Sequence, residues 1–254
     1  MSASIDASAL EFRNPPVQEA VLEIRFSPNP KVTFAHLEKF ADAMGTQYPN
    51  RVKQQALDVN LDMDGAGMNH IGVTPLGIQL HSADNSRNII AKADTVGVSF
   101  LRPYKRWPSI RETLQDVYLQ YRRIVPQLSI IRLGMRYINR VELPSVGGNI
   151  NRFLKAPPVL PQGEGLPQAL WQFQTVVIIP IEEVDGIAVV KQAIIEPDEE
   201  SKTVPFILDI DVVHTAADTG VDENSMWERF DKMRDVRNRI FLGCLHDNAL
   251  EPYR

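Results

Sequence analysis

Two long segments of this sequence alternate apolar and charged residues with a period of two, the spacing at which successive side chains fall on opposite faces of a β-strand. In the segment 129–143, apolar residues occupy one face and arginines the other. The segment 204–214 follows the same pattern, with aspartates in place of arginines. We therefore predict two strands that each turn one face to a core and present a polar face on the other side.

Shorter patterns predict the rest of an α+β fold. Apolar residues that alternate or run together between turn residues predict further strands. These strands are expected at 17–26, 56–63, 76–82, 88–93, 96–101, 169–180 and 186–196. Apolar residues at helical spacing predict helices at 32–44, 107–125 and 224–242, with a short one at 149–156. The dipeptide Asp185-Gly186 is typical of a hairpin turn.

The predicted elements follow a similar order in the two halves of the chain. Each half has a strand, a helix, several antiparallel strands and a closing helix near a tryptophan, Trp107 or Trp227. We expect two intimately packed α+β halves, 1–128 and 129–254, or one continuous domain. The pattern predicts a duplicated, curved antiparallel sheet with helices on one face, as in helix-grip or saddle-like folds, although short patterns also repeat by chance.

Composition and charge narrow the classes of protein that this chain can represent. Hydrophobic residues make up 44% of the 254 residues and charged residues 23%, which is typical of a folded globular chain. A net charge of -5 argues against a general nucleic-acid-binding surface. The longest apolar run, at 176–181, is too short to span a membrane, and no secretory signal is recognisable, so we expect a cytoplasmic protein with no membrane partner.

The polar faces of the two long strands form the strongest candidate site. Arginine binds carboxylate and phosphate groups through two parallel hydrogen bonds, so an arginine-rich strand face suits an anionic ligand or a partner. If the two strands are neighbours, arginines and aspartates meet across the sheet, and the first strand can join them. The candidate binding residues are Arg132, Arg136, Arg140, Asp209, Asp211, Glu23 and Arg25. The alternative is a solvated or self-paired polar face.

A second basic cluster lies just before and within the start of the helix at 107–125. It combines aromatic and basic side chains, which can stack on bases and hold phosphates. Its residues are Arg102, Tyr104, Lys105, Arg106 and Trp107. The alternative is a junction between loop and helix whose aromatic residues pack in the core.

Recognisable catalytic, metal and cofactor patterns are not found in the sequence. The five histidines lack ligand spacing, and no phosphate-binding glycine loop or GxSxG motif is present. Asp209 and Asp211 could share a divalent cation, but no third acidic residue in a known pattern accompanies them. Cys244, the single cysteine, lies among apolar residues and is expected to be a buried filler. We expect no cofactor, no metal and no catalytic residue, which leaves an enzyme the less favoured class.

Four blocks of this sequence are similar to those of a known group of proteins. They are NPPVQEAVLEIRF, LGMRYINRVELP, FILDIDVV and MWERFDKMRDVRNRIF, and together they span nearly the whole chain. In their order they resemble a sporadically distributed family of uncharacterised prokaryotic proteins of similar length. The resemblance implies no catalytic residues, and it implies a gene context near toxin–antitoxin or phage-defence loci.

Three functions remain open from the sequence. The first is a non-enzymatic interaction protein whose sheet edge or polar face binds another protein or a second copy, as a dimer or within an operon-encoded complex. The second is a binder of small anions, or a hydrolase, with a cavity between the sheet and the C-terminal helix lined by Arg136, Asp209 and Asp211. The third is an accessory protein that binds nucleic acid through the segment 102–111 and the 132–140 face.

Overall fold

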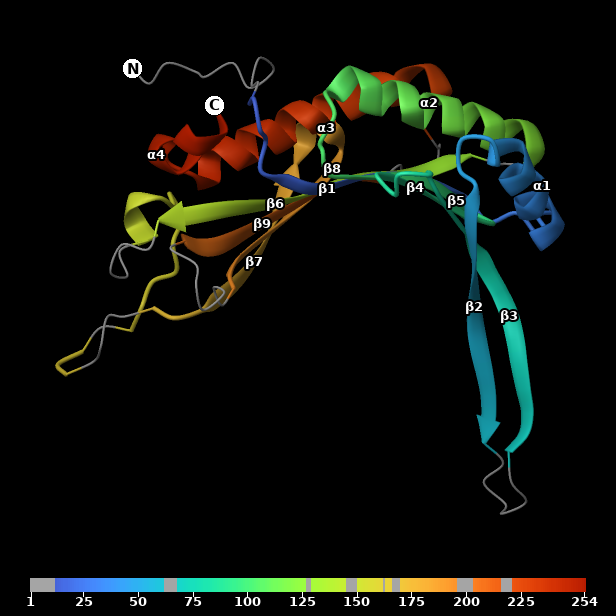
Figure 1. Cartoon of the computed structure of the whole chain (residues 1–254), viewed down its shortest axis with the longest axis horizontal. Coiled ribbons are helices and arrows are strands. Elements are labelled where there is room, and N and C mark those ends of the chain that lie inside the picture. The colour runs from blue at the N-terminus through green and yellow to red at the C-terminus, as the bar shows by residue number, and fades with distance from the viewer. Residues whose placement is uncertain are drawn as a thin grey trace. The chain divides into compact units, whose positions relative to one another are not determined.

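The computed structural model describes residues 12–61, 68–126, 129–144, 150–161, 163–165, 170–195, 203–215 and 221–254. Within these residues nine strands form one antiparallel sheet in the order β2-β3-β4-β5-β1-β6-β9-β8-β7, accompanied by four α-helices (Figure 1). The strands are β1 (Val17–Phe26), β2 (Asn50–Leu61), β3 (Met68–His81), β4 (Arg87–Lys92), β5 (Thr95–Leu101), β6 (Ile130–Pro144), β7 (Phe173–Ile181), β8 (Gly186–Ile194) and β9 (Thr203–Thr215). The helices are α1 (Phe34–Met44), α2 (Trp107–Ile124), α3 (Glu223–Cys244) and α4 (Asp247–Leu250). The predicted α+β class and antiparallel sheet are confirmed.

The chain divides into two compact units. The first unit comprises residues 21–132 and 217–221, and the second comprises residues 1–20, 133–216 and 222–254. The division falls within β1 and within β6, so both strands contribute residues to each unit.

The first unit has an aromatic core between its strands and its helices. In β1, Leu22, Ile24 and Phe26 are buried, as the alternation predicts. The ring of Phe26 stacks on Tyr121 of α2 at 5.8 Å, and Phe40 of α1 meets Tyr121 edge-on at 5.4 Å. The Tyr121 hydroxyl donates a hydrogen bond to the Lys92 carbonyl oxygen, which fixes α2 on the end of β4.

The hairpin of β2 and β3 is longer than the sequence predicts. The two strands pair from Asn50 opposite His81 to Leu61 opposite Met68, whereas β4 pairs with β3 only between Gly77 and His81. The rest of the hairpin therefore extends past β4 (Figure 1). The sequence pattern predicts these strands only from 56 and from 76. For β2 the reason is that residues 50–55 are nearly all polar and carry no apolar alternation.

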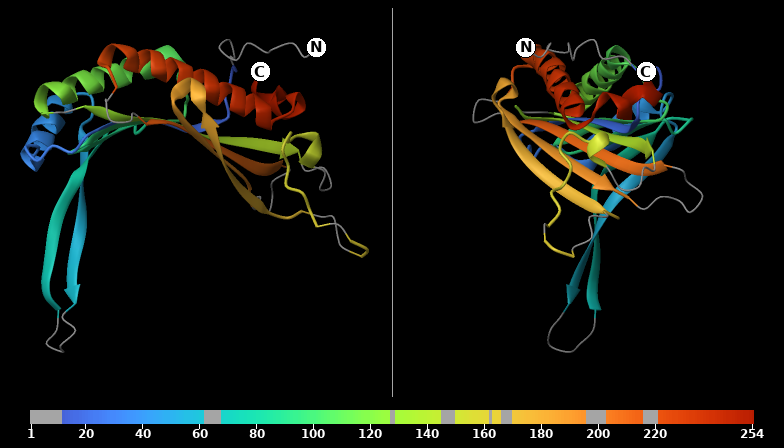
Figure 2. Two further views of the ribbon diagram at one scale, coloured as in Figure 1. Left: turned by 180° about the vertical axis from the view of Figure 1, so that it is seen from behind. Right: turned by 90° about the vertical axis from the view of Figure 1, so that its left-hand side faces the viewer.

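The second unit buries the apolar faces of β6, β8 and β9 beneath α3 (Figure 2). In β6, Leu133, Met135 and Tyr137 are buried while the arginines lie on the reverse face, as predicted. Asn139 also lies on the buried face, where its amide donates a hydrogen bond to the Leu208 carbonyl oxygen at 2.9 Å.

Two local elements of the second unit can be compared with the sequence pattern: the helix predicted at 149–156 and the turn predicted at Asp185-Gly186. The helix predicted at 149–156 is only a 3-10 turn at Ile150–Arg152, because Leu154 leaves it to form a β-bridge with Leu245. The hairpin turn at Asp185-Gly186 is confirmed, with Asp185 in the left-handed region at φ 46°. Gly186 is required there, since a Cβ atom at this position would lie 1.9 Å from the Val213 carbonyl oxygen.

A few terminal positions of the predicted elements, at 62–63, 149, 169 and 196, lie outside the described residues. Among the described residues, no helix combines the length and the apolar character that crossing a membrane requires.

Candidate interaction site

The predicted contact between β6 and β9 is present in the second unit. The Arg136 guanidinium donates two parallel hydrogen bonds to Asp209, from Nε to Oδ1 at 2.8 Å and from Nη2 to Oδ2 at 2.7 Å. Lys191, which is paired in register with Asp209, places its Nζ 3.8 Å from the same carboxylate. Alternation in three neighbouring strands thus brings one acid and two bases together on one face.

Within this cluster the charge of Arg136 is already compensated by Asp209. The Asp209 side chain is only 9% exposed, and its hydrogen bonds raise the pKa of the Arg136 guanidinium above its ordinary value. Asp211 and Glu19 add negative charge near Arg136. An anionic ligand would have to displace a buried carboxylate that already binds Arg136 in the geometry that guanidinium prefers. The arrangement favours a self-paired polar face.

The other three arginines among the candidate binding residues are paired with carboxylates of the same chain. In the second unit Arg140 donates to Glu142 at 2.6 Å, and the Thr203 hydroxyl donates to the other oxygen of that carboxylate at 2.8 Å. In the first unit Arg132 binds Glu23 at 2.5 Å. Arg25 pairs instead with Asp94 at 3.4 Å.

The predicted nucleic-acid cluster is split between core and surface in the first unit. Trp107 is only 8% exposed and begins α2, so its ring is not available to stack on a base. Tyr104 is half-buried, while Arg102, Lys105 and Arg106 are exposed. This burial favours the alternative in which the aromatic residues pack at the junction of loop and helix.

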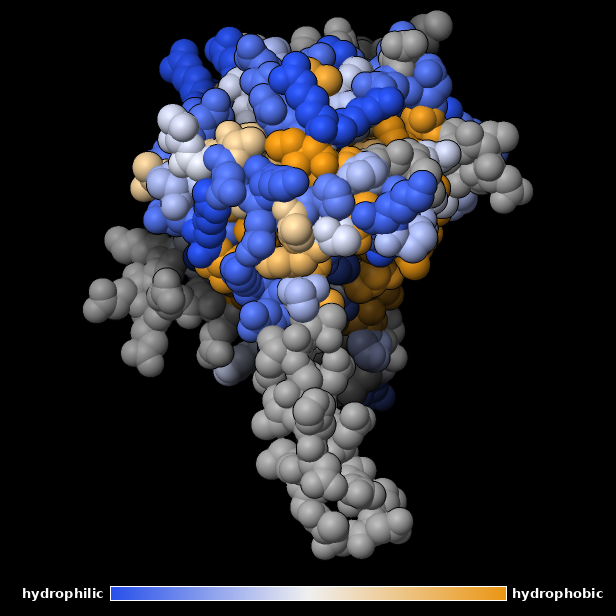
Figure 3. Space-filling model, turned by 90° about the vertical axis from the view of Figure 1, so that its right-hand side faces the viewer, coloured by the Kyte–Doolittle hydropathy of each residue, from blue (hydrophilic) through white to orange (hydrophobic). Residues whose placement is uncertain are grey.

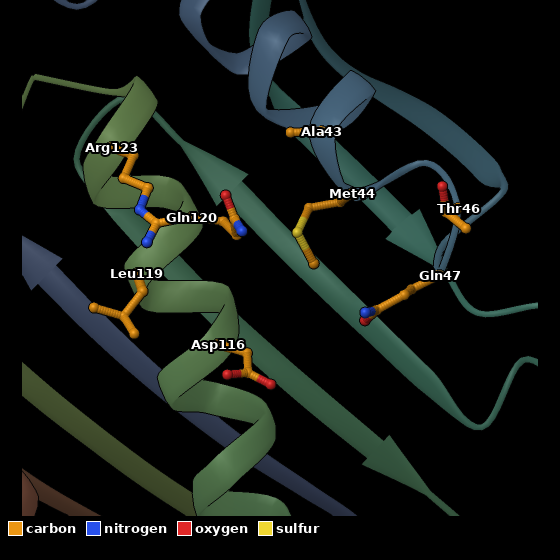
Figure 4. Close-up of a pocket in the computed structure, with 8 residues that line it drawn as sticks. All are labelled: Ala43, Met44, Thr46, Gln47, Asp116, Leu119, Gln120 and Arg123. Carbon is orange, nitrogen blue, oxygen red and sulfur yellow. The ribbon is translucent and has the colours of Figure 1, made fainter.

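A groove of about 370 Å³ lies between α1 and α2 in the first unit. Met44 and Gln47 point toward α2, and Asp116 and Gln120 point toward α1 (Figure 4). The lining residues include one acid, Asp116, and one base, Arg123, and they do not include Arg136 or the aspartates of β9. This lining supplies no nucleophile activated by a base. The surface on the side of α1 is mainly hydrophilic (Figure 3).

Two of the histidines, His36 and His214, and the cysteine have structural roles. His36 accepts a hydrogen bond from the Thr33 amide at 3.1 Å and so caps α1, while the buried His214 lies 2.6 Å from the Val184 carbonyl oxygen through Nδ1. Cys244 is buried, and desolvation raises the pKa of its thiol to about 11. Across the described part of the chain, no group of three or more His, Cys, Asp or Glu residues could hold a metal ion.

Sequence reasoning did not single out the exposed apolar strand β7 as a site. It is the last strand of the sheet and, within the described ranges, pairs only with β8 (Figure 2). Four consecutive residues are exposed: Val176 54%, Val177 47%, Ile178 63% and Ile179 37%. Because successive side chains point to opposite faces, β7 exposes apolar side chains on both faces of the sheet edge. Ile187 of β8, 38% exposed, extends the apolar surface on the face that carries Ile178.

A sequence signal for this edge exists in residues 176–181. Proline has no main-chain N–H and within sheets occurs in edge strands, at strand starts and at bulges, so Pro180 far from the start of the predicted strand favours an edge. The run VVIIPI lacks alternation, which is typical of a strand buried on both faces. An edge strand whose sequence is typical of burial on both faces is suited to being covered by a partner.

The end of β7 is held in place by α3. Arg229 donates to Asp185 at 2.9 Å, and Arg239 donates to Glu183, so two arginines of the helix bind the turn that joins β7 to β8. His214 of β9 contacts the same turn through Val184. The edge is therefore a fixed part of the second unit.

No protein-family model matches this chain, and no curated protein matches it significantly. Its function therefore has to be inferred from its own geometry.

Proposed function

We propose that this protein is a non-enzymatic interaction protein that binds a protein chain through the free edge of β7. The observation that carries the proposal is the run of exposed residues Val176–Ile179 on a terminal strand. Long exposed apolar edges template pairing with another strand, and natural proteins usually protect them with charge, proline or a cover.

The other edge of the sheet provides a comparison. There β2 carries Arg51 and Lys53 near its start, and Lys53 forms an ion pair with Glu38 at 2.8 Å. Charged side chains of this kind discourage edge-to-edge pairing. Strand β7 has no charged residue over Phe173–Ile181. The charges that protect the β2 edge are therefore missing from β7, in which Pro180 lies near the end of the strand.

The energy available from covering β7 is substantial. Full burial of a valine or isoleucine side chain is worth about 1.5–3 kcal/mol, and four such side chains of β7 are between one third and two thirds exposed. Main-chain hydrogen bonds to a new strand would add to this gain, as in recognition by strand addition.

We also propose that the chain arose by duplication of one α+β half, as in saddle-like folds. In the sheet, β5, β4 and β3 follow one another outward from β1, as β9, β8 and β7 do from β6. Along the chain, α2 comes directly after β5, as α3 comes directly after β9. Both correspondences support this origin. In this alignment β7 corresponds to β3, whose outer side is paired with β2. An experimental structure in which the two sets of elements fail to superpose would contradict the duplication.

Photo-crosslinking in cells tests the interaction function. A photoreactive phenylalanine analogue replaces Ile178 in β7, and a matched variant carries it at Val52, which is 50% exposed in β2. We expect a covalent protein adduct at position 178 and little or none at position 52. Absence of an adduct at 178, or equal yields at both positions, would contradict the proposal.

A further inference from the structure

The register of β8 shows which main-chain groups of β7 face the free edge. The Ile195 amide donates to the Pro205 carbonyl oxygen at 3.1 Å, so odd-numbered residues of β8 direct their main-chain groups to β9. Even-numbered residues of β8 then face β7, where their partners are odd-numbered, as in the pair Val177 and Val190. The residues of β7 that present their main-chain groups to the open edge are therefore Gln174, Val176, Ile178 and Pro180.

We infer that a second copy of this chain covers the edge, with β7 paired antiparallel to the partner's β7 about a two-fold axis at Val177. This inference rests on the proposed function and names its partner. In this register Val176 lies opposite Ile178 of the second copy, and Val177 lies opposite its own counterpart. Val176 and Ile178 both face the edge, so each can exchange hydrogen bonds with the other across the axis, as an isologous interface requires.

The strand is complementary to itself in charge. With no charged residue over Phe173–Ile181, an antiparallel copy brings no like charges together within the pairing. The acidic residues after the strand lie beyond the paired segment, and Glu183 is already bound by Arg239. The strand best suited to pair with this edge is uncharged and largely apolar, and β7 is itself such a strand.

A row of core residues in the second unit ends at an exposed residue of β7. Ile210, Val190 and Val177 form a row in register across β9, β8 and β7. Ile210 and Val190 are buried, whereas Val177 is 47% exposed. Pairing at Val177 would continue the row through the same three residues of the second copy and bury its exposed end.

Pro180 selects this register among the neighbouring ones. A hydrogen-bonded pair needs one residue from each copy whose main-chain groups face the edge. Because these residues are all even-numbered, the two-fold axis can lie at one residue or the next but not between residues. An axis at Ile178 would set Pro180 opposite Val176 in the middle of the ladder, where its missing N–H would cost hydrogen bonds. An axis at Val176 would set Ile178 opposite Gln174. The axis at Val177 pairs Val176 with Ile178 at the centre and sets Pro180 opposite Gln174, nearer the ends of the paired segment.

Cysteine crosslinking of the purified full chain tests the inference. In the variant Val177→Cys the two thiols would lie across a non-hydrogen-bonded pair, with Cα atoms about 4.5 Å apart, within the range of a disulfide. The matched control Ile179→Cys would place its thiols about 13 Å apart along the strands. Cys244 remains in place because it is buried.

We expect an oxidant such as oxidised glutathione to give a disulfide-linked dimer of Val177→Cys and little from Ile179→Cys. Light scattering should give the wild type twice the mass of one chain, and Ile178→Lys should weaken the dimer at least about tenfold. A monomeric wild type, or preferential crosslinking through cysteine at 176 or 178, would overturn the inference. Adducts at position 178 to a different protein, with a monomeric purified chain, would overturn this inference while the proposed function stands.

Discussion

At the scale of single residues, the buried carboxylate of Asp209 is the centre of the polar face. Asp209→Ala removes both hydrogen bonds to Arg136 and the contact with Lys191. We expect a loss of about 1–2 kcal/mol in the free energy of unfolding, less than for a fully buried pair because the Arg136 side chain is 42% exposed.

Urea denaturation measures the loss, and Asp42→Ala is the matched control. Asp42 pairs with Arg51 at 2.6 Å, but its side chain is 70% exposed. Removal of such a surface pair should cost less than about 0.5 kcal/mol. Equal losses from the two variants would show that the Asp209 cluster contributes no more than a surface ion pair.

Gly186 offers a second test among single residues. In Gly186→Ala the new Cβ would lie 1.9 Å from the Val213 carbonyl oxygen, so either β8 or β9 has to move. We expect a loss of about 2–4 kcal/mol in the free energy of unfolding. Gly243→Ala in α3 meets no atom within 4 Å and should instead stabilise the protein by about 0.5–1 kcal/mol. Thermal and urea unfolding measure both changes, and effects of the same sign would contradict the prediction.

At the scale of elements, the pattern of hydrogen exchange along β7 should follow the register. The Val177 amide is directed to β8, whereas the Val176 amide is directed to the open edge. In Ile178→Lys, at a protein concentration where this variant is monomeric, the Val177 amide should therefore exchange slowly and the Val176 amide fast. If the wild type pairs through β7 as proposed, both of its amides should be protected. Residue-resolved exchange measured by NMR checks this, and equal rates in the monomeric variant would contradict the assigned register.

At the scale of the whole molecule, association through β7 links stability to concentration. If folded chains pair and unfolded chains do not, the wild-type Tm should rise with protein concentration. The Tm of Ile178→Lys should stay constant over the same range, whereas Val52→Lys, on the other edge strand, should keep the wild-type dependence. Scanning calorimetry over a range of protein concentrations measures all three. A wild-type Tm that does not change would argue against a dimer.

Much of the fold could be predicted because strands and helices with one buried face have apolar residues at regular spacing in the sequence. The buried faces of β1, β6 and β9 coincide with the alternating residues, and α2 covers the predicted segment to within one residue. Prediction failed where periodicity is weak. The polar start of β2 carries no apolar face, and the segment at 149–156 has helical composition but is drawn into a bridge with Leu245.

The candidate site shows the same limit. Alternation placed Arg136 and Asp209 on polar faces, but only the order of strands in the sheet makes them partners. Arg25 was grouped with them, yet its partner is Asp94, from the turn before β5. A sequence records which face a residue occupies, while pairing across strands depends on contacts between distant segments.

Local spacing and burial were enough to specify the α+β class, most of the strands and helices, and the separation of apolar from charged faces. The folded chain was needed to show that the arginines of the polar face are neutralised internally. It was also needed to show that, among the described residues, the apolar run 176–181 lies on the last strand of the sheet. Both depend on which strand lies beside which, and that order is set by long-range packing that no local pattern records.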